Sequence, residues 1–443
     1  MVAELLRRSL WIPAFAGMAI LVWTTPAASQ TLAITNARLV IGDGSATIEG
    51  GTVLVRDGRI SAAGAKVAIP RGAHIIDAQG KWVTPGLVAG FSRVGMVEVD
   101  SVSSANDAGA AGSPFSAALD VAPAVNPRAA AIAISRARGV TRAIVAPEAR
   151  RAIFGGQGSV IDLGDDMDAV TRSRAFQFVE LGEAGARSAG GSRAAAHLEF
   201  RNALLEARDY ARNPSGYGGR ERDALLMRLD AAALVPVVEG RMPLLIHVER
   251  ASDILRVLDL KREFPVLRLV LVGASEGWTV APQIAAAKVP VIASPLADLP
   301  AAFETLAATQ SNVGRMDYAG ATVAIGMIND NETRQIRLIR QYAGNLVALT
   351  RVPGATGLDW AKAFATISSK PAEAIGMGGE IGSLRPGRRA DVVIWDGDPL
   401  ELSSAPVAVW IDGVAQSLDN RQTHLRDRYR RPGEGALPKA YER

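Results

Sequence analysis

The sequence predicts an α/β protein in which a parallel sheet with crossover helices lies between two short β-rich segments. Apolar runs of strand length alternate with helix-like stretches between about residues 87 and 358, and this alternation is typical of parallel sheets. Short strand patterns separated by glycine turns occupy both ends of that region. The chain has 443 residues, of which 48% are hydrophobic, so it is long enough to bury a large core.

The first β pattern occupies residues 30–87. Residues 32–41 alternate with the period of a strand, and Asp57 and Gly58 give a tight-turn signal between two further strands. A second β pattern occupies residues 380–418, with strands expected at 390–395 and 406–412. Each segment alone has too few strands to be stable. We therefore expect the two to pair into one small composite β-sandwich.

The central region contains the α/β alternation. Strands are expected at 143–146, 244–246, 269–272, 289–293 and 322–325, and helices at 251–261 and 280–288. This pattern fits a closed barrel and a doubly wound open sheet equally well. Residues 101–130 are rich in Ala, Gly and Ser and are expected to form a long surface excursion.

The N-terminus has the pattern of a signal peptide over residues 1–29. Arg7 and Arg8 precede an apolar run at 9–23, and small residues follow it, so we expect cleavage between Ala28 and Gln30. No later stretch is apolar enough to span a bilayer. The expected location of the mature chain is therefore periplasmic or extracellular.

Charge and cysteine content exclude several classes of function. The net charge is +4, and the basic residues are interspersed with acidic ones, so no nucleic-acid partner is expected. The chain has no cysteine, which rules out disulfides and a thiolate nucleophile or ligand.

Three segments resemble a known family. Residues 81–88 (KWVTPGLV) resemble the entry of amidohydrolases into their barrel, and residues 369–376 and 382–399 resemble their return to the β domain. Residues 420–423 resemble the tail of the exported, imidazolonepropionase-like branch. The resemblance implies a distorted (β/α)8 TIM barrel at 88–379, the sandwich at 30–87 and 380–418, and a charged tail at 419–443.

The first barrel strand departs from the family pattern. Active members carry two histidines on alternate residues there, which point the same way and share a metal ion. This chain has Phe91 and Arg93 at the two positions. Phenylalanine has no lone pair to donate, and arginine is a permanent cation that repels a divalent ion. The resemblance therefore indicates a degenerate metal site.

The other strand ends retain only part of the family's donor set. His247 stands where the family has a ligand histidine, so it is either a remaining metal ligand or a hydrogen-bonded histidine that closes the strand. Glu249 is a candidate helper, whereas Gly273 occupies the position of a second histidine. Ile328 replaces the catalytic aspartate, and Asn329 and Asp330 follow it at once. Asp330 is the candidate catalytic base, with helix capping as the alternative role.

We expect Phe91, Arg93, His247, Glu249, Gly273 and Asn329 to line a pocket at the barrel mouth. Residues 155–158, the run Gly-Gly-Gln-Gly, lack the ending of a phosphate loop and are expected to form a loop over this mouth.

Two functions remain open. The first is a hydrolase of non-peptide C–N or amide bonds in a small molecule, which would need zinc or a similar metal, with His247 as ligand and Asp330 as base. The second, which the residues favour, is a catalytically inactive amidohydrolase-like protein, a pseudoenzyme that binds a ligand or partner and needs no cofactor. A small-molecule ligand is expected, and Arg93 favours an anionic one. An active amidohydrolase paralogue or a second copy of the chain is the expected protein partner.

Overall fold

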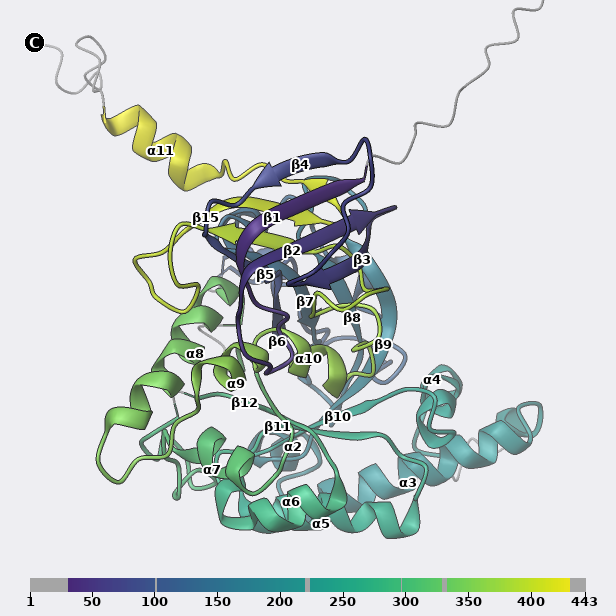
Figure 1. The fold of residues 1–443 in the computed structure, drawn as a ribbon. Helices are drawn as coiled ribbons and strands as arrows, with labels where there is room; N and C mark the ends of the chain where they lie inside the picture. The colour runs from purple at the N-terminus through teal and green to yellow at the C-terminus, as the bar shows by residue number, and fades with distance from the viewer. Residues whose placement is uncertain (1–30, 100–101, 220–223, 296, 329–332, 431–443) are drawn as a thin grey trace, which may run out of the picture.

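The computed structural model describes residues 31–99, 102–219, 224–295, 297–328 and 333–430. The chain forms a β module from its two ends and a larger body in which helices surround a second sheet (Figure 1). In the described residues, no helix is long and apolar enough to cross a bilayer.

The body is built on an eight-stranded sheet in the order β13-β12-β11-β10-β9-β8-β7-β6. Its strands are β6 (Leu87–Ser92), β7 (Val140–Val145), β8 (Phe154–Asp162), β9 (Val170–Glu180), β10 (Leu244–Val248), β11 (Leu269–Gly273), β12 (Val291–Ala293) and β13 (Val323–Ile325). The strands expected in the central region are all present. This mixed α/β body confirms the predicted fold class at the level of a barrel-like sheet.

The two end strands of this sheet meet, so that the barrel is nearly closed. The backbone amide of Met327, just after β13, donates to the carbonyl of Phe91 in β6 at 2.9 Å. Glycines allow the approach: a Cβ atom on Gly90 would overlap the carbonyl of Ile325, and one on Gly326 would lie 2.7 Å from the Cβ of Phe91. Glycine in a strand commonly marks such a close backbone contact.

The body departs from a regular (β/α)8 barrel at β8. This strand is antiparallel to both β7 and β9, and no helix separates the three strands. The Gly155–Gly158 run lies inside β8 and is buried, so the prediction of a loop was wrong. The aromatic side chains of β9 explain the glycines, because a Cβ on Gly155 would lie 3.0 Å from the ring of Phe178 and one on Gly158 would overlap Phe176.

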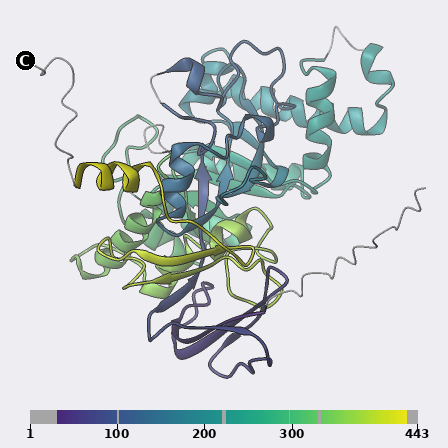
Figure 2. The ribbon, with the colours of Figure 1, turned by 90° about the horizontal axis from the view of Figure 1, so that it is seen from above.

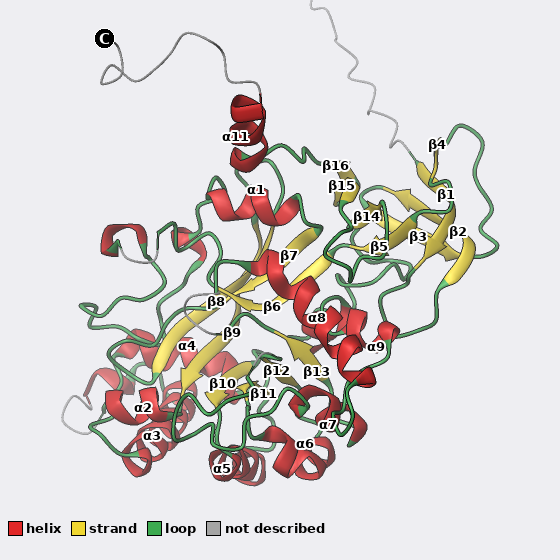
Figure 3. Cartoon of the chain, turned by 90° about the vertical axis from the view of Figure 1, so that its left-hand side faces the viewer, coloured by secondary structure: helices red, strands yellow, loops and turns green. Residues whose placement is uncertain are grey.

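Helices cover the outside of the sheet (Figure 3). The α-helices of the described residues are α1 (Ala130–Arg136), α2 (Glu183–Ser188), α3 (Arg193–Arg212), α4 (Arg228–Val238), α5 (Ala251–Glu263), α6 (Ala281–Ala287), α7 (Asn312–Tyr318), α8 (Ile339–Ala348), α9 (Trp360–Ala365), α10 (Ser369–Ala374) and α11 (Arg421–Arg430). The helices α3, α5 and α6 lie on the side away from the β module (Figure 1). Of the predicted charged tail, α11 is described and has no buried residue.

Side chains of alternate strand residues fill the barrel or face the helices, as the period of a strand requires. Leu245 of β10 packs with Phe91, Phe178 and Val270 in the inner cluster. Its neighbours Leu244 and Ile246 belong to the outer core. The segment before α1 also contributes to this outer core through Ala108, Ala117 and Val121. The predicted excursion at 101–130 is therefore partly buried rather than purely superficial.

The β module is one sheet in the order β16-β15-β14-β5-β1-β2-β3, with β4 beside β1. Its strands are β1 (Leu32–Leu39), β2 (Ile48–Arg56), β3 (Arg59–Gly64), β4 (His74–Asp77), β5 (Trp82–Pro85), β14 (Val392–Trp395), β15 (Pro406–Ile411) and β16 (Val414–Ala415). The two ends of the chain join where β5 pairs with β14, and they lie side by side in Figure 2. This pairing shows that the two end segments share one sheet. The predicted two-layer sandwich is not shown by it and stays a prediction.

A buried arginine connects the barrel to the module. Arg142 of β7 is fully buried and donates two hydrogen bonds to Asp391, at 2.7 and 3.0 Å. Its guanidinium also lies 2.8 Å from a carboxylate oxygen of Asp412, beyond the end of β15. A further donated bond reaches Thr171 of β9 at 2.6 Å. One side chain thus bonds to residues from both sheets.

Candidate functional site

His247 lies near the C-terminal end of β10, where folds of this kind place their sites. The register of the parallel pair β9–β10 sets it opposite Glu180, the last residue of β9. The imidazole is held between two carboxylates. Its Nδ1 atom lies 2.8 Å from Oε2 of Glu180, and its Nε2 atom lies 2.9 Å from Oε1 of Glu249. Only 18% of the His247 side chain is exposed.

This environment favours a protonated histidine. Burial alone would lower the pKa of His247, but the charges and hydrogen bonds of Glu180 and Glu249 raise it well above its usual range. Burial would raise the pKa of Glu249, but the hydrogen bond and charge of His247 lower it. The charge pattern is therefore a cationic imidazole that donates from both nitrogens to two anionic carboxylates.

Glu249 is held in place from the neighbouring strand. Its Oε2 atom accepts a hydrogen bond from the backbone amide of Ser275 at 2.7 Å. Gly273, at the end of β11, has a φ of +88°, and a Cβ there would lie 2.7 Å from the carboxylate carbon of Glu249. A larger side chain would collide with Glu249 and strain the backbone. Glycine at position 273 therefore leaves room for the carboxylate of Glu249.

The two strand-one residues differ in their surroundings. Phe91 is buried inside the barrel, and its ring lies 5.5 Å from that of Phe178 between centroids. Arg93 follows β6, is 9% exposed, and has its backbone amide bonded to the carbonyl of Thr333 at 2.8 Å. Phe91 thus contributes to packing beneath the mouth, and Arg93 brings a nearly buried positive charge.

An ionic network lies at the rim beside Glu180. Glu304 accepts a hydrogen bond from the amide of Glu183 at 2.7 Å and another from Arg193 at 3.0 Å. Arg193 also donates to Asp253 of α5 at 2.9 Å. The pKa of Glu304 is raised by burial, against lowering contributions from the Glu183 amide and from His247. The carboxylates make this side of the mouth more acidic than the sequence indicated.

The described residues bring together His247, Glu249 and Gly273 of the predicted pocket. Asn329 and Asp330 lie outside the described residues, so the structure places neither. Across the described ranges, no group of three or more His, Asp or Glu side chains has the arrangement of a metal site.

Glu180 is the residue that sequence reasoning missed. It directly follows residues 175–179 (AFQFV), which are apolar except for Gln177. This is the pattern of a buried strand that ends in a charged residue at the sheet edge. The sequence therefore indicated a charged residue at a strand end. Because this strand belongs to an antiparallel hairpin, its position in the sheet could not be predicted from strand–helix alternation.

Comparison with known proteins identifies the C-terminal part of the barrel. Residues 292–415, from β12 through β16, match the amidohydrolase family. This part of the chain is therefore similar to amidohydrolase-family domains. A curated relative, the amidohydrolase tasK of Hapsidospora irregularis, is 26% identical over 407 residues. The alignment covers 83% of this chain but only 40% of that relative, so the chain spans less than half of its length.

Solved structures share the fold of most of this chain. An amidohydrolase from Thermotoga maritima has a TM-score of 0.76 at 24% identity, covering 88% of this chain and all of that one. Molinate hydrolase has a TM-score of 0.53 at 18% identity, covering 88% and 95% of the two chains. An adenosine deaminase from Xanthomonas campestris with bound zinc has a TM-score of 0.51 at 18% identity, covering 90% and 97%. These similarities show the fold that the chain shares with those structures.

Proposed function

We propose that this chain is a small-molecule-binding protein built on the amidohydrolase fold, and that it lacks the metal-dependent hydrolysis of active members. One observation carries the proposal: both ring nitrogens of His247 are engaged by carboxylates, at 2.8 Å from Glu180 and 2.9 Å from Glu249. A histidine binds a metal through a deprotonated ring nitrogen, whereas this imidazole is held in its protonated form.

The donor set supports the same proposal. The two nitrogens of one imidazole point away from each other, so Glu180 and Glu249 cannot both reach an ion bound to His247 where they now lie. A catalytic zinc site needs three protein ligands that converge on one point. Phe91 and Arg93 supply none, and Gly273 has no side-chain donor. The described residues therefore do not fit a tightly bound divalent ion.

The proposal also covers the kind of ligand, the location of the protein and its protein partner. Arg93 favours a ligand with a carboxylate or phosphate group. The N-terminal pattern favours export to the periplasm or the medium, although residues 1–29 lie outside the described ranges. The proposed protein partner of this chain is an active amidohydrolase relative or a second copy of the chain.

Hydrolysis of a C–N bond is the second candidate, favoured by the amidohydrolase-family match over residues 292–415. Metal analysis separates the two. We expect the purified protein, after incubation with zinc and removal of free metal, to carry far less than one equivalent of zinc by elemental analysis. His247→Ala should leave that content unchanged. One equivalent of zinc, with amide or lactam hydrolysis abolished by a chelator and by His247→Ala, would overturn the binding-protein proposal.

A further inference from the structure

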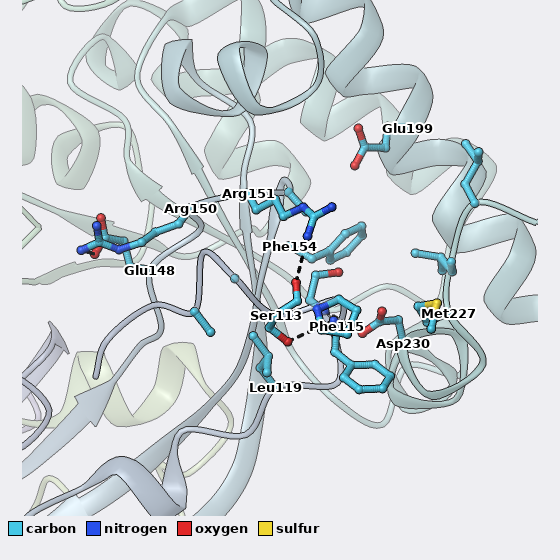
Figure 4. A pocket seen from close by; sticks show the side chains of 17 residues that line it. Ser113, Phe115, Leu119, Glu148, Arg150, Arg151, Phe154, Glu199, Met227 and Asp230 are labelled. Carbon is cyan, nitrogen blue, oxygen red and sulfur yellow. Dashed lines mark hydrogen bonds and ion pairs between the residues drawn. The ribbon is translucent and has the colours of Figure 1, made fainter. Parts of the chain in front are cut away.

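A cavity of about 190 Å³ lies beside the barrel wall, outside the His247 site (Figure 4). Its walls come from the segment before α1, the β7–β8 connection, the start of β8, and the helices α3 and α4. None of the six residues predicted to line the pocket at the barrel mouth lines this cavity. The volume far exceeds the share of one water molecule, about 30 Å³, yet is smaller than a drug-sized pocket of roughly 300 Å³ or more. It therefore suits a small ligand.

Asp230, in the first turn of α4, is a buried carboxylate in this cavity without a cation. The residue is 2% exposed. Its Oδ1 atom accepts hydrogen bonds from the backbone amides of Ser116 at 3.0 Å and Ala118 at 2.8 Å. No described residue forms an ion pair with it or donates to Oδ2. Burial raises the pKa of Asp230, against the lowering effect of the two amides.

A structural role explains only part of this arrangement. The Oδ1 atom fastens the loop that carries Ser116 to α4, and an asparagine could do the same. The negative charge and the second oxygen need another partner, because a buried carboxylate without a cation is costly. A ligand with an ammonium group would supply both the charge and the hydrogen-bond donors.

Arg151 offers the complementary group on another wall of the cavity (Figure 4). Its guanidinium makes one long hydrogen bond, 3.5 Å to the carbonyl of Ser113, and no ion pair with a described residue. The adjacent Arg150 differs, since it is paired with Glu148 at 2.6 Å. Arg151 is therefore the arginine available for a carboxylate, which it can bind in a bidentate manner.

Apolar side chains also contribute to the walls of this cavity. Phe115, Phe154, Leu119 and Met227 line the cavity near Asp230 and Arg151 (Figure 4). Apolar walls with a few oriented polar groups are typical of small-molecule sites.

We propose that this cavity binds a free amino acid with an apolar side chain, whose ammonium group pairs with Asp230 and whose carboxylate pairs with Arg151. The apolar side chain packs against the aromatic and aliphatic walls. The site is separate from His247, so this inference stands whether or not the barrel mouth hydrolyses a substrate.

Isothermal titration calorimetry with the full chain tests the proposal. L-phenylalanine should bind with one-to-one stoichiometry. Phenethylamine, which has no carboxylate, and 3-phenylpropanoate, which has no ammonium, should each bind about tenfold more weakly or worse, because each loses one charged hydrogen-bonded contact. L-phenylalaninamide should behave like the amine, which separates a free amino acid from the N-terminus of a peptide.

Three variants complete the test. Asp230→Asn keeps an acceptor for the loop amides, and Arg151→Gln keeps a polar side chain; each should weaken L-phenylalanine binding about tenfold or more. Arg187→Ala, which removes an exposed arginine of α2 outside the cavity, should not change it, and neither should His247→Ala. If Asp230→Asn misfolds, Arg151→Gln and the three analogues decide. Absence of millimolar binding, or equal binding of L-phenylalanine and 3-phenylpropanoate, would overturn the inference.

Discussion

At the scale of single residues, the site is defined by the two carboxylates that hold one imidazole. A histidine at the end of a barrel strand is commonly a metal ligand in this kind of fold, but here Glu249 lies where an ion would approach Nε2. The charge on the ring then depends on its neighbours, because each carboxylate favours the protonated form.

Glu180→Gln should lower the pKa of His247, because it removes one of the two negative charges that hold the proton. The chain has only four histidines, so NMR titration of the imidazole signals can follow each one. The imidazole of His247 should stay protonated to a higher pH in the wild type than in the variant. Glu239→Gln, on the surface beside Arg241, is the matched control. An unchanged His247 titration in Glu180→Gln would contradict the proposed pairing.

The sequence could predict some of these residues and not others. His247 was recognisable because it closes an apolar run of strand length, and Phe91 and Arg93 because they follow a recognisable motif. The pairing with Glu180 could not be predicted, because it depends on the β9–β10 register, which only the folded sheet sets. Glu249 was found, but its position on Nε2 rests on the amide of Ser275, a contact between neighbouring strand ends.

At the scale of elements, the closure of the barrel rests on two glycines. Gly90→Ala should destabilise the protein by about 1–3 kcal/mol, the range seen when a well-packed core must accept extra volume. The added methyl group would overlap the carbonyl of Ile325 and separate β6 from β13. Chemical denaturation of the purified variant measures the change.

Gly112→Ala is the control for this substitution. Nothing lies within 4 Å of a Cβ at Gly112, and its φ is not in the left-handed region. The change should be neutral or slightly stabilising, because alanine reduces the freedom of the unfolded chain. Equal loss of stability in both variants would show that the contact between β6 and β13 does not depend specifically on Gly90.

The hairpin at β8 shows where strand prediction from sequence failed. A glycine run resembles a loop when it is considered alone, and the chain between 147 and 170 contains several turn-forming residues. The missing information was the pair of large rings on β9, which fill the space above Gly155 and Gly158. Strand–helix alternation, by contrast, predicted β10 to β13 correctly, since the next α-helix along the chain after each strand is α5, α6, α7 and α8 in turn.

At the scale of the whole molecule, Arg142 makes the barrel and the module depend on each other. Its charge is buried and is compensated by Asp391 and Asp412, with Asp162 at 3.5 Å. Removing one partner leaves part of a buried charge uncompensated, which is generally destabilising.

Asp412→Asn should therefore lower stability at pH 7 by about 1.5 kcal/mol, the lower end for a hydrogen bond to a charged group. Burial would raise the pKa of Asp412, but Arg142 and Arg389 lower it. Its charge thus contributes stability that is present above the ordinary aspartate pKa, about 3.9, and is lost as pH falls through the lower folded value. Urea unfolding at pH 7 and near pH 3 should show the difference between wild type and variant shrinking in acid. Asp168→Asn, an exposed residue, should show no such trend. A difference that stays constant with pH would exclude this electrostatic origin.

The pairing of β5 with β14 also has a consequence for the order of events during synthesis. Thr84 in β5 lies opposite Val393 in β14, which the ribosome adds roughly 300 residues later, about 15 to 60 s at usual elongation rates. Throughout that interval the backbone groups along one edge of β5 have no strand to pair with, and open edges of this kind promote aggregation. The nascent chain therefore has to keep its first strands apart from other chains until nearly its last segment emerges.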